Sequence, residues 1–377
     1  MTILLALLVF SVIVIVHELG HYWTAKKAGI LVEEFSLGMG PRLLSFKRGE
    51  TRWSLKLLPL GGSCAMLGED GDDPDNKSNR SFASKSVGWR FIVLVGGSAM
   101  NFILAYIIAV IISLFSSHQV AIISDFVSIE TVQELGLDIV TPYEAGLRIG
   151  DRITHINGNR VRVYGDFILE MLVADGSPID LTINREGEIL QFRVNPFHTG
   201  DRWIIGFVPS FGVGAFFPQT QTTAEGDVFY IDEQPHIIRN SFGSAFPRAF
   251  NEVSFTIRST FVVLSRLITG NAGAGELVGP VGIVNFLGDA IEAAPTVTSI
   301  FWTIMNFTLL LSANLGIINL LPIPAMDGGR LMFVGLEAIR RKPISPEKEG
   351  IIHFAGFVLL MILAAFIFYN DILRIIS

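Results

Sequence analysis

The sequence is poor in charged residues and almost free of cysteine. Only 17% of its 377 residues are charged, whereas soluble globular proteins carry about 25%. The single cysteine, Cys64, excludes an intrachain disulfide framework and a cysteine-rich metal site. The formal net charge of -7 provides no basic surface of the kind that binds nucleic acid, so we expect no nucleic-acid partner. Any zinc site must therefore use mainly His and carboxylate ligands.

Hydrophobic residues make up 50% of the chain and concentrate in four long runs. At about 1.5 Å per residue, roughly 20 helical residues cross the hydrocarbon core of a bilayer. Each run is long enough, so the sequence predicts a polytopic α-helical membrane protein. The four transmembrane helices are expected at about residues 2–25, 89–115, 299–323 and 351–373.

The distribution of positive charge predicts how these helices are oriented. The connections 26–90 and 327–350 are rich in Lys and Arg, which favours the cytoplasmic side of a membrane. Both chain ends and the long middle segment would then lie outside. Residues 118–240 contain no Lys and more than twice as many acidic residues as Arg, which is typical of a soluble extracytoplasmic domain.

The first apolar run leads directly into His17, Glu18 and His21. The two His are four residues apart, so a helix places both imidazoles on one face, where they can bind one metal ion. Glu18 lies beside that metal, in the position of the general base of a zinc hydrolase. A cleavable signal peptide is a poor alternative, because no Lys or Arg precedes the run and no small-residue cleavage site follows it.

A catalytic zinc needs a third protein ligand, and Asp327 is the candidate. It follows the third apolar run at the cytoplasmic end, at the same depth as the two His, where a charged group is costly. Pro322 and Pro324 must interrupt the helix just before it. The spacing alone leaves open that Asp327 is only a cap or turn residue at a helix end.

Residues 31–67 predict a β element between the first two helices. Two candidate strands, 42–46 and 51–57, are separated by a turn at residues 48–50. Two interpretations remain open. The element is either a small cytoplasmic hairpin lying on the membrane, or a sheet edge beside the metal that pairs with an extended substrate.

The middle segment has the alternation of a small α/β domain, expected at residues 118–200. A short helix and a Gly turn are followed by a strand, an Asn-Gly turn, a second helix and two more strands; the longer elements are expected at 152–156, 164–173, 179–184 and 189–194. Residues 118–196 resemble a bacterial PDZ domain, although the spacing from Pro142 to Ala145 is one residue shorter than usual. Such a domain binds a peptide or substrate tail at a sheet edge, or it only filters substrates by size.

Residues 201–297 are expected to connect this domain to the second membrane half, residues 298–377. Within the connection, charged and apolar side chains of residues 242–268 separate onto two sides of a helix, which is typical of an interfacial amphipathic helix. The Gly-rich residues 270–282 predict a loop.

Two motifs together resemble the site-2 protease family of intramembrane zinc metalloproteases, and most closely its bacterial RseP/RasP type. The first is His-Glu-x-x-His in the first transmembrane helix, and the second is Asn-x-x-Pro-x-Pro-x-x-Asp-Gly-Gly from Asn319 to Gly329. Segments 38–41, 59–62 and 279–283 also match. The resemblance implies that zinc is bound by His17, His21 and Asp327, that Glu18 is the catalytic base, that Asn319 and Pro324 position substrate, and that residues 31–67 are membrane-reentrant.

The resemblance also implies a function. Such enzymes hydrolyse peptide bonds within transmembrane segments of single-span proteins, for example anti-sigma factors or signal-peptide remnants, in the bacterial cytoplasmic membrane. The chain has one PDZ-like module where RseP has two in tandem, because residues 203–237 are too few for a second. Two rivals are a scaffold that binds extracytoplasmic tails and a metal transporter. A scaffold has no need of Glu18, and a transporter would prefer more intramembrane ligands.

Overall fold

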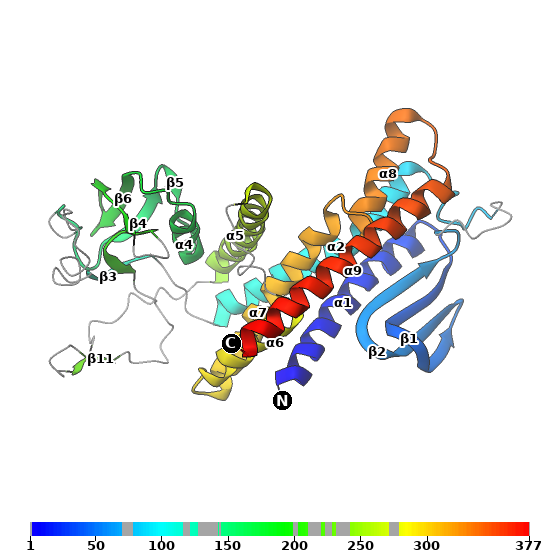
Figure 1. Cartoon of the computed structure of the whole chain (residues 1–377), viewed down its shortest axis with the longest axis horizontal. Coiled ribbons are helices and arrows are strands. Elements are labelled where there is room, and N and C mark those ends of the chain that lie inside the picture. The colour runs from blue at the N-terminus through cyan, green and yellow to red at the C-terminus, as the bar shows by residue number, and fades with distance from the viewer. Residues whose placement is uncertain are drawn as a thin grey trace. The chain divides into compact units, whose positions relative to one another are not determined.

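The chain divides into two compact units in a computed structural model (Figure 1). One unit comprises residues 1–109 and 256–377, and the other comprises residues 110–255. The structure describes residues 2–69, 78–115, 121–126, 142, 145–198, 203–209, 220–222, 228–230, 242–270 and 279–376.

Four of the described helices are long and apolar enough to cross a membrane, as the hydrophobic runs predict. Their ends differ from the predicted ones by at most five residues. They are α1 (Thr2–Lys27), α2 (Val87–Phe115), α7 (Val297–Leu320) and α9 (Pro346–Ile376).

Helices α1, α2 and α7 pack closely at the level of the His-Glu-x-x-His motif. A Cβ added to Gly20 of α1 would overlap the backbone of Gly96 in α2, so the two helices touch backbone to backbone. The hydroxyl of Ser312 in α7 donates a 2.8 Å hydrogen bond to the carbonyl of Asn101 in α2. These contacts bring residues from both ends of the sequence around the metal motif.

A long β-hairpin follows α1 and is formed by β1 (Val32–Arg48) and β2 (Thr51–Met66). The predicted strands 42–46 and 51–57 are therefore too short, although the turn lies where it was expected. The hairpin curls back on itself, because Phe35 is in register with Trp53 on one side and with Cys64 on the other. Gly38 and Gly40 lie inside β1 with φ of +87°, a conformation that costs glycine little and lets the strand bend instead of ending.

Two further helices, α6 (Pro280–Glu292) and α8 (Asp327–Arg340), were not predicted. The expected loop 270–282 lies partly outside the described residues, but Pro280 begins α6. Proline suits the first position of a helix, where its missing N–H costs nothing. The buried carboxylate of Asp371 in α9 accepts hydrogen bonds from the N–H groups of Gly279 (3.1 Å) and Gly282 (2.8 Å), which fastens the start of α6.

The second unit contains a four-stranded antiparallel sheet in the order β5-β4-β6-β7. Its strands and the helix α4 agree closely with the predicted element positions. Buried Ile153, Leu181 and Phe167 belong to its apolar core. Whether this unit is a PDZ domain stays a prediction, and the expected short helix falls partly on residues outside the described ones. The elements are β4 (Arg152–Ile156), β5 (Asn159–Arg160), α4 (Tyr164–Leu172), β6 (Ile179–Arg185) and β7 (Glu188–Val194).

The remaining described elements of the middle segment are short strands and one long helix, α5 (Phe242–Thr269). Strand β3 (Ile123–Phe126) pairs antiparallel with β10 (Phe207–Pro209). Two other hairpin-like pairs are β8 (Phe197–His198) with β9 (Trp203–Ile204), and β11 (Thr220–Thr222) with β12 (Val228–Tyr230).

Candidate metal centre

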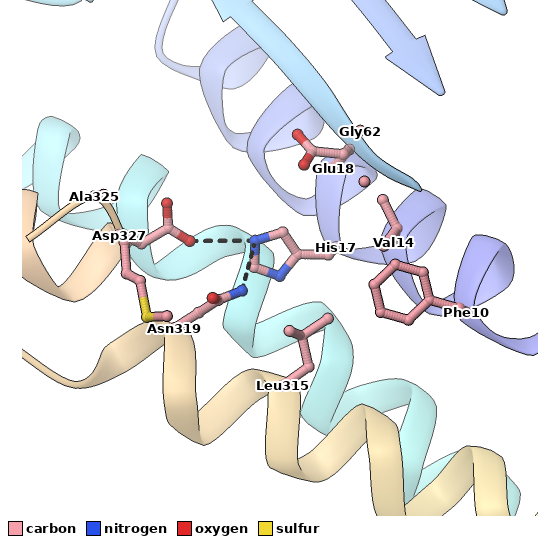
Figure 2. A pocket seen from close by; sticks show the side chains of 11 residues that line it. Phe10, Val14, His17, Glu18, Gly62, Leu315, Asn319, Ala325 and Asp327 are labelled. Atoms are coloured by element: carbon pink, nitrogen blue, oxygen red, sulfur yellow. Dashed lines mark hydrogen bonds and ion pairs between the residues drawn. The ribbon is translucent and has the colours of Figure 1, made fainter. Parts of the chain in front are cut away.

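Helix α1 places His17 and His21 one turn apart on a buried face. Their Nε2 atoms lie 3.2 Å from each other. The Oδ2 atom of Asp327 lies 3.2 Å from Nε2 of His17 and 3.3 Å from Nε2 of His21. Three ligand-type atoms from two distant parts of the sequence thus form a small triangle, and Figure 2 shows His17 facing Asp327.

This triangle has the dimensions that a zinc ion requires. Ligand atoms about 2.0 Å from a tetrahedral zinc are separated by roughly 3.3 Å, which agrees with all three distances. Apart from the two imidazole nitrogens, the buried Oδ2 atom of Asp327 has no hydrogen-bond partner among the described residues. A carboxylate oxygen left in that state is suited to a cation. The donor set, two imidazoles and one carboxylate, leaves a fourth position open as in catalytic zinc sites.

Gly97 of α2 leaves the space in which the two imidazoles converge. A Cβ at this position would overlap Nε2 of His21 and would lie 2.6 Å from Nε2 of His17. Any side chain here would fill the volume between the ligand atoms. The glycine therefore keeps this space clear.

The other ring nitrogens of both His are also bonded to α2. Nδ1 of His21 donates to the carbonyl of Val93 at 2.9 Å, since a carbonyl can only accept, and this leaves Nε2 free to bind a cation. Nδ1 of His17 lies 3.2 Å from the side-chain amide of buried Asn101. Rotating that amide by 180° lets Oδ1 of Asn101, otherwise unpaired, accept a hydrogen bond from the N–H at Nδ1 of His17.

Val93 and Asn101 were not predicted from the sequence. The amide of Asn101 did leave a signal, because a polar residue inside an apolar membrane helix is costly and commonly functional. The backbone carbonyl of Val93 left no such signal in the sequence, since every residue has a backbone carbonyl.

A cavity of about 250 Å³ opens beside the triangle. Glu18 and Asn319 both line it, and the Asn319 amide nitrogen lies 3.4 Å from Nε2 of His17 (Figure 2). Gly62 of β2 lies against α1 here, because a Cβ added to it would be only 3.0 Å from Cγ of Glu18. The hairpin therefore contributes a wall of the cavity.

Asp327 reaches the cavity through a short irregular loop. Helix α7 ends at Leu320, and Asp327 is the first residue of α8. A Cβ at Gly328 would overlap the backbone at Leu320 and Leu321, so this glycine allows the chain to turn tightly. Asp327 thus lies in the first turn of α8 and beside both His, whereas the N-cap of this helix is Met326. Pro324 does not line the cavity, whereas the two residues after it do.

The sequence model of peptidase family M50 matches residues 5–363. The chain belongs to this family. This M50 peptidase is 32% identical over 374 residues to a putative zinc metalloprotease of Clostridium perfringens, with 99% of both chains covered. It is 31% identical to the zinc metalloprotease RasP of Oceanobacillus iheyensis and 29% identical to the regulator of sigma-W protease RasP of Bacillus subtilis, again with 99% of each chain covered.

Membership in M50 makes the chain a zinc-dependent metallopeptidase of the site-2 protease type. The four helices that can span a bilayer are consistent with a membrane-embedded enzyme. The M50 assignment therefore agrees with the fold and with the fit of the triangle to zinc.

Proposed function

We propose that the chain hydrolyses peptide bonds within transmembrane segments of single-span membrane proteins. In this proposal His17, His21 and Asp327 hold the zinc ion, and Glu18 is the catalytic base. The observation that carries it is the ligand triangle itself, because two of its three members, His17 and His21, lie on a helix long and apolar enough to span a bilayer. A protease whose metal site is part of a membrane helix is suited to substrates that are in the membrane.

The chain's own side chains suit the steps of hydrolysis. Zinc, when bound, would supply Lewis-acid chemistry that polarises the scissile carbonyl and acidifies a water molecule. Glu18 lines the same cavity, so it can take a proton from the attacking water and return it to the leaving amine. The Asn319 amide can donate a hydrogen bond to a substrate carbonyl, and Pro324 helps to fix the loop that leads to Asp327.

A helical substrate must unwind before it is cut, and its freed backbone groups then need partners inside the bilayer. The edge of β2 at Gly61 and Gly62 lines the cavity and can accept an extended segment as an added strand. In the described register Gly62 pairs with Leu37 alone, so this part of β2 has a strand neighbour on one side. The hairpin also exposes many large apolar side chains, which supports a membrane-reentrant element: Met39, Leu43, Leu44, Phe46, Leu57 and Leu58.

The relatives support a regulatory role. One of them is named regulator of sigma-W protease, which suits anti-sigma factors as substrates; signal-peptide remnants are a second class of single-span substrate. The charge distribution supports a bacterial cytoplasmic membrane location with the zinc site near the cytoplasmic side. In this arrangement the PDZ-like unit faces outward and binds or filters the tails of substrates.

The number of metal sites favours the protease over a metal transporter. In the part of the chain that the structure describes, His17, His21 and Asp327 are the one group of three His, Cys, Asp or Glu side chains able to hold a metal ion. Transport through a membrane would need a succession of such sites. A scaffold would need neither the triangle nor Glu18.

Substitution of Glu18 by Gln tests the proposal. The protein is purified in detergent, and its zinc content is compared with its cleavage of a model single-span substrate. We expect Glu18→Gln to keep zinc and to lose cleavage by at least ~10²-fold, because a general base is removed and the ligands stay. Glu33→Gln, the same change at an exposed position of β1, is the matched control and should cleave normally. Unimpaired cleavage by Glu18→Gln would refute the role of Glu18.

A further inference from the structure

Helix α9 touches the loop that carries the proposed third zinc ligand. The backbone N–H of Ala325 donates a 2.8 Å hydrogen bond to Nδ1 of His353. Gly356 lies three residues further along α9, on the same face. A Cβ added to Gly356 would overlap Pro324, so helix and loop are in direct contact at two points.

The loop cannot satisfy this N–H by itself. Residues 321–326 are all described, and the other N–H groups among them bond to carbonyls of the loop or of the preceding turn. Pro322 and Pro324 have no N–H. Ala325 is therefore the residue of this segment whose N–H reaches another element, and that element is α9.

Ala325 is also conformationally strained. Its φ of +71° is in the left-handed region, which is unfavourable for a residue that has a Cβ. Such a conformation persists only where surrounding contacts hold it. The bond to His353 and the packing of Gly356 on Pro324 are contacts of this kind.

The position of Ala325 matters to the zinc site. Ala325 and Met326 line the cavity together with Asp327. Only one residue separates Ala325 from Asp327, whose Oδ2 atom lies 3.2–3.3 Å from both imidazoles. A shift of this backbone by a fraction of an ångström would change both the triangle and the cavity wall.

We infer that His353 is a positioning residue for the zinc site. By accepting the Ala325 N–H, it holds the loop that places Asp327 in the ligand triangle and that forms one wall of the cavity. Because a backbone N–H can only donate, Nδ1 of His353 must be the unprotonated nitrogen of a neutral ring. The inference rests on the proposed zinc ligands.

A pair of similar-sized substitutions separates positioning from simple helix packing. Asn carries an oxygen at the δ position, where His carries Nδ1, so His353→Asn keeps an acceptor. Leu has no acceptor but is the better helix former. A purely structural role in α9 predicts that His353→Leu is tolerated better than His353→Asn, and positioning predicts the opposite order.

The measurement is zinc release from the purified full-length protein into excess EDTA. We expect His353→Leu to lose zinc at least ~10-fold faster than wild type, as for other residues that support a ligand. His353→Asn should stay close to the wild-type rate. With cobalt in place of zinc, the visible spectrum should change in His353→Leu and be restored in His353→Asn. Equal zinc release by wild type and His353→Leu, or faster release by His353→Asn than by His353→Leu, would overturn the inference.

A second variant disturbs the same contact without touching His353. Gly356→Ala should push Pro324 and speed zinc release, whereas Gly350→Ala on the same helix meets no atom within 4 Å and should not. Equal release by the two glycine variants would count against the inference.

The zinc contents of wild type and His21→Ala distinguish failure of the inference from failure of the proposed ligand set. Absence of zinc from wild type, or full zinc retention by His21→Ala, would overturn the ligand set and with it the inference. Zinc retained by wild type, lost by His21→Ala and held normally by His353→Leu would overturn the inference alone.

Discussion

Gly97 shows how a residue without a side chain can determine a metal site. It provides the space between the two Nε2 atoms, which a Cβ would fill. We expect Gly97→Ala to weaken zinc binding by at least ~10-fold and to reduce cleavage in parallel, because the imidazoles must move apart. Zinc stoichiometry after dialysis against a chelator measures this.

Gly88→Ala in the same helix is the control for Gly97→Ala. No atom lies within 4 Å of a Cβ at Gly88, so the control should keep zinc and activity. Normal zinc retention by Gly97→Ala would mean that the ion does not occupy the space beside this glycine.

Asn101 contacts the ring nitrogen of His17 that does not face Asp327. Once its amide is rotated so that the oxygen faces Nδ1, it can hold the ring with Nε2 toward Asp327. We expect Asn101→Leu to weaken zinc binding by about 10–100-fold, the usual cost of losing such a partner, while Asn101→Asp keeps the acceptor and most of the affinity. Competition with a chromogenic zinc chelator measures both. Equal affinities of the Leu and Asp variants would contradict this role.

The sequence predicted the ligand candidates more readily than their support. His17 and His21 follow from helical spacing, and Asp327 follows from its place after a broken apolar run. Gly97, Val93 and Asn101 act through the packing of α2 against α1, which is a tertiary property. The spacing of residues within one helix does not say which face of a second helix will pack against it.

The hairpin is held in its curled form by a charged cluster around Glu34. Arg42 donates two hydrogen bonds to this carboxylate, at 2.7 and 3.0 Å, and the Ser54 hydroxyl donates a third at 2.6 Å. The bonds from Arg42, with help from Ser54 and Lys56, lower the pKa of Glu34 to about 2. The carboxylate therefore joins two parts of β1 to β2.

The lowered pKa of Glu34 predicts a pH dependence of stability. A depressed pKa stabilises the fold above the ordinary value of 4.5, and this contribution is lost as the pH falls from 4.5 toward about 2. We expect Glu34→Gln to lower the melting temperature at pH 6 and to lower it by clearly less at pH 3, where part of the contribution is lost. Thermal unfolding of both proteins across this range tests it. A difference that is the same at both pH values would contradict the role of the carboxylate.

Elements built from regular patterns were predicted well, and elements that begin or bend at glycine or proline were not. The four apolar runs and the strands of the α/β unit gave helices and strands within a few residues of their predicted ends. Strand β1 was predicted too short because glycines such as Gly38 and Gly40 usually end a strand, whereas here they bend it. Helix α6 was missed because Gly279 and Pro280 are typical of loops, and the carboxylate that fastens its start, Asp371, lies far along the chain.

At the scale of the molecule, the α/β unit is an insertion with adjacent ends. Strand β3 enters it and β10 leaves it, and the two are antiparallel partners, with Ile123 in register with Pro209. The intervening chain can therefore be replaced by a short Gly-Ser linker without stretching the flanking backbone. The ligand triangle lies wholly in the other unit, which has its own apolar core.

Removal of residues 124–208 should therefore separate substrate choice from chemistry. We expect the shortened protein to keep zinc and to cut a minimal single-span substrate at a rate within ~10-fold of wild type, because none of the proposed ligands or Glu18 lies in the excised part. Substrates with bulky extracytoplasmic domains, which a filter would reject, should be cut faster than by wild type. The comparison of a short-tailed and a bulky substrate measures this selectivity. An unchanged ratio of the two rates, with zinc retained, would show that the unit neither binds nor filters substrate tails.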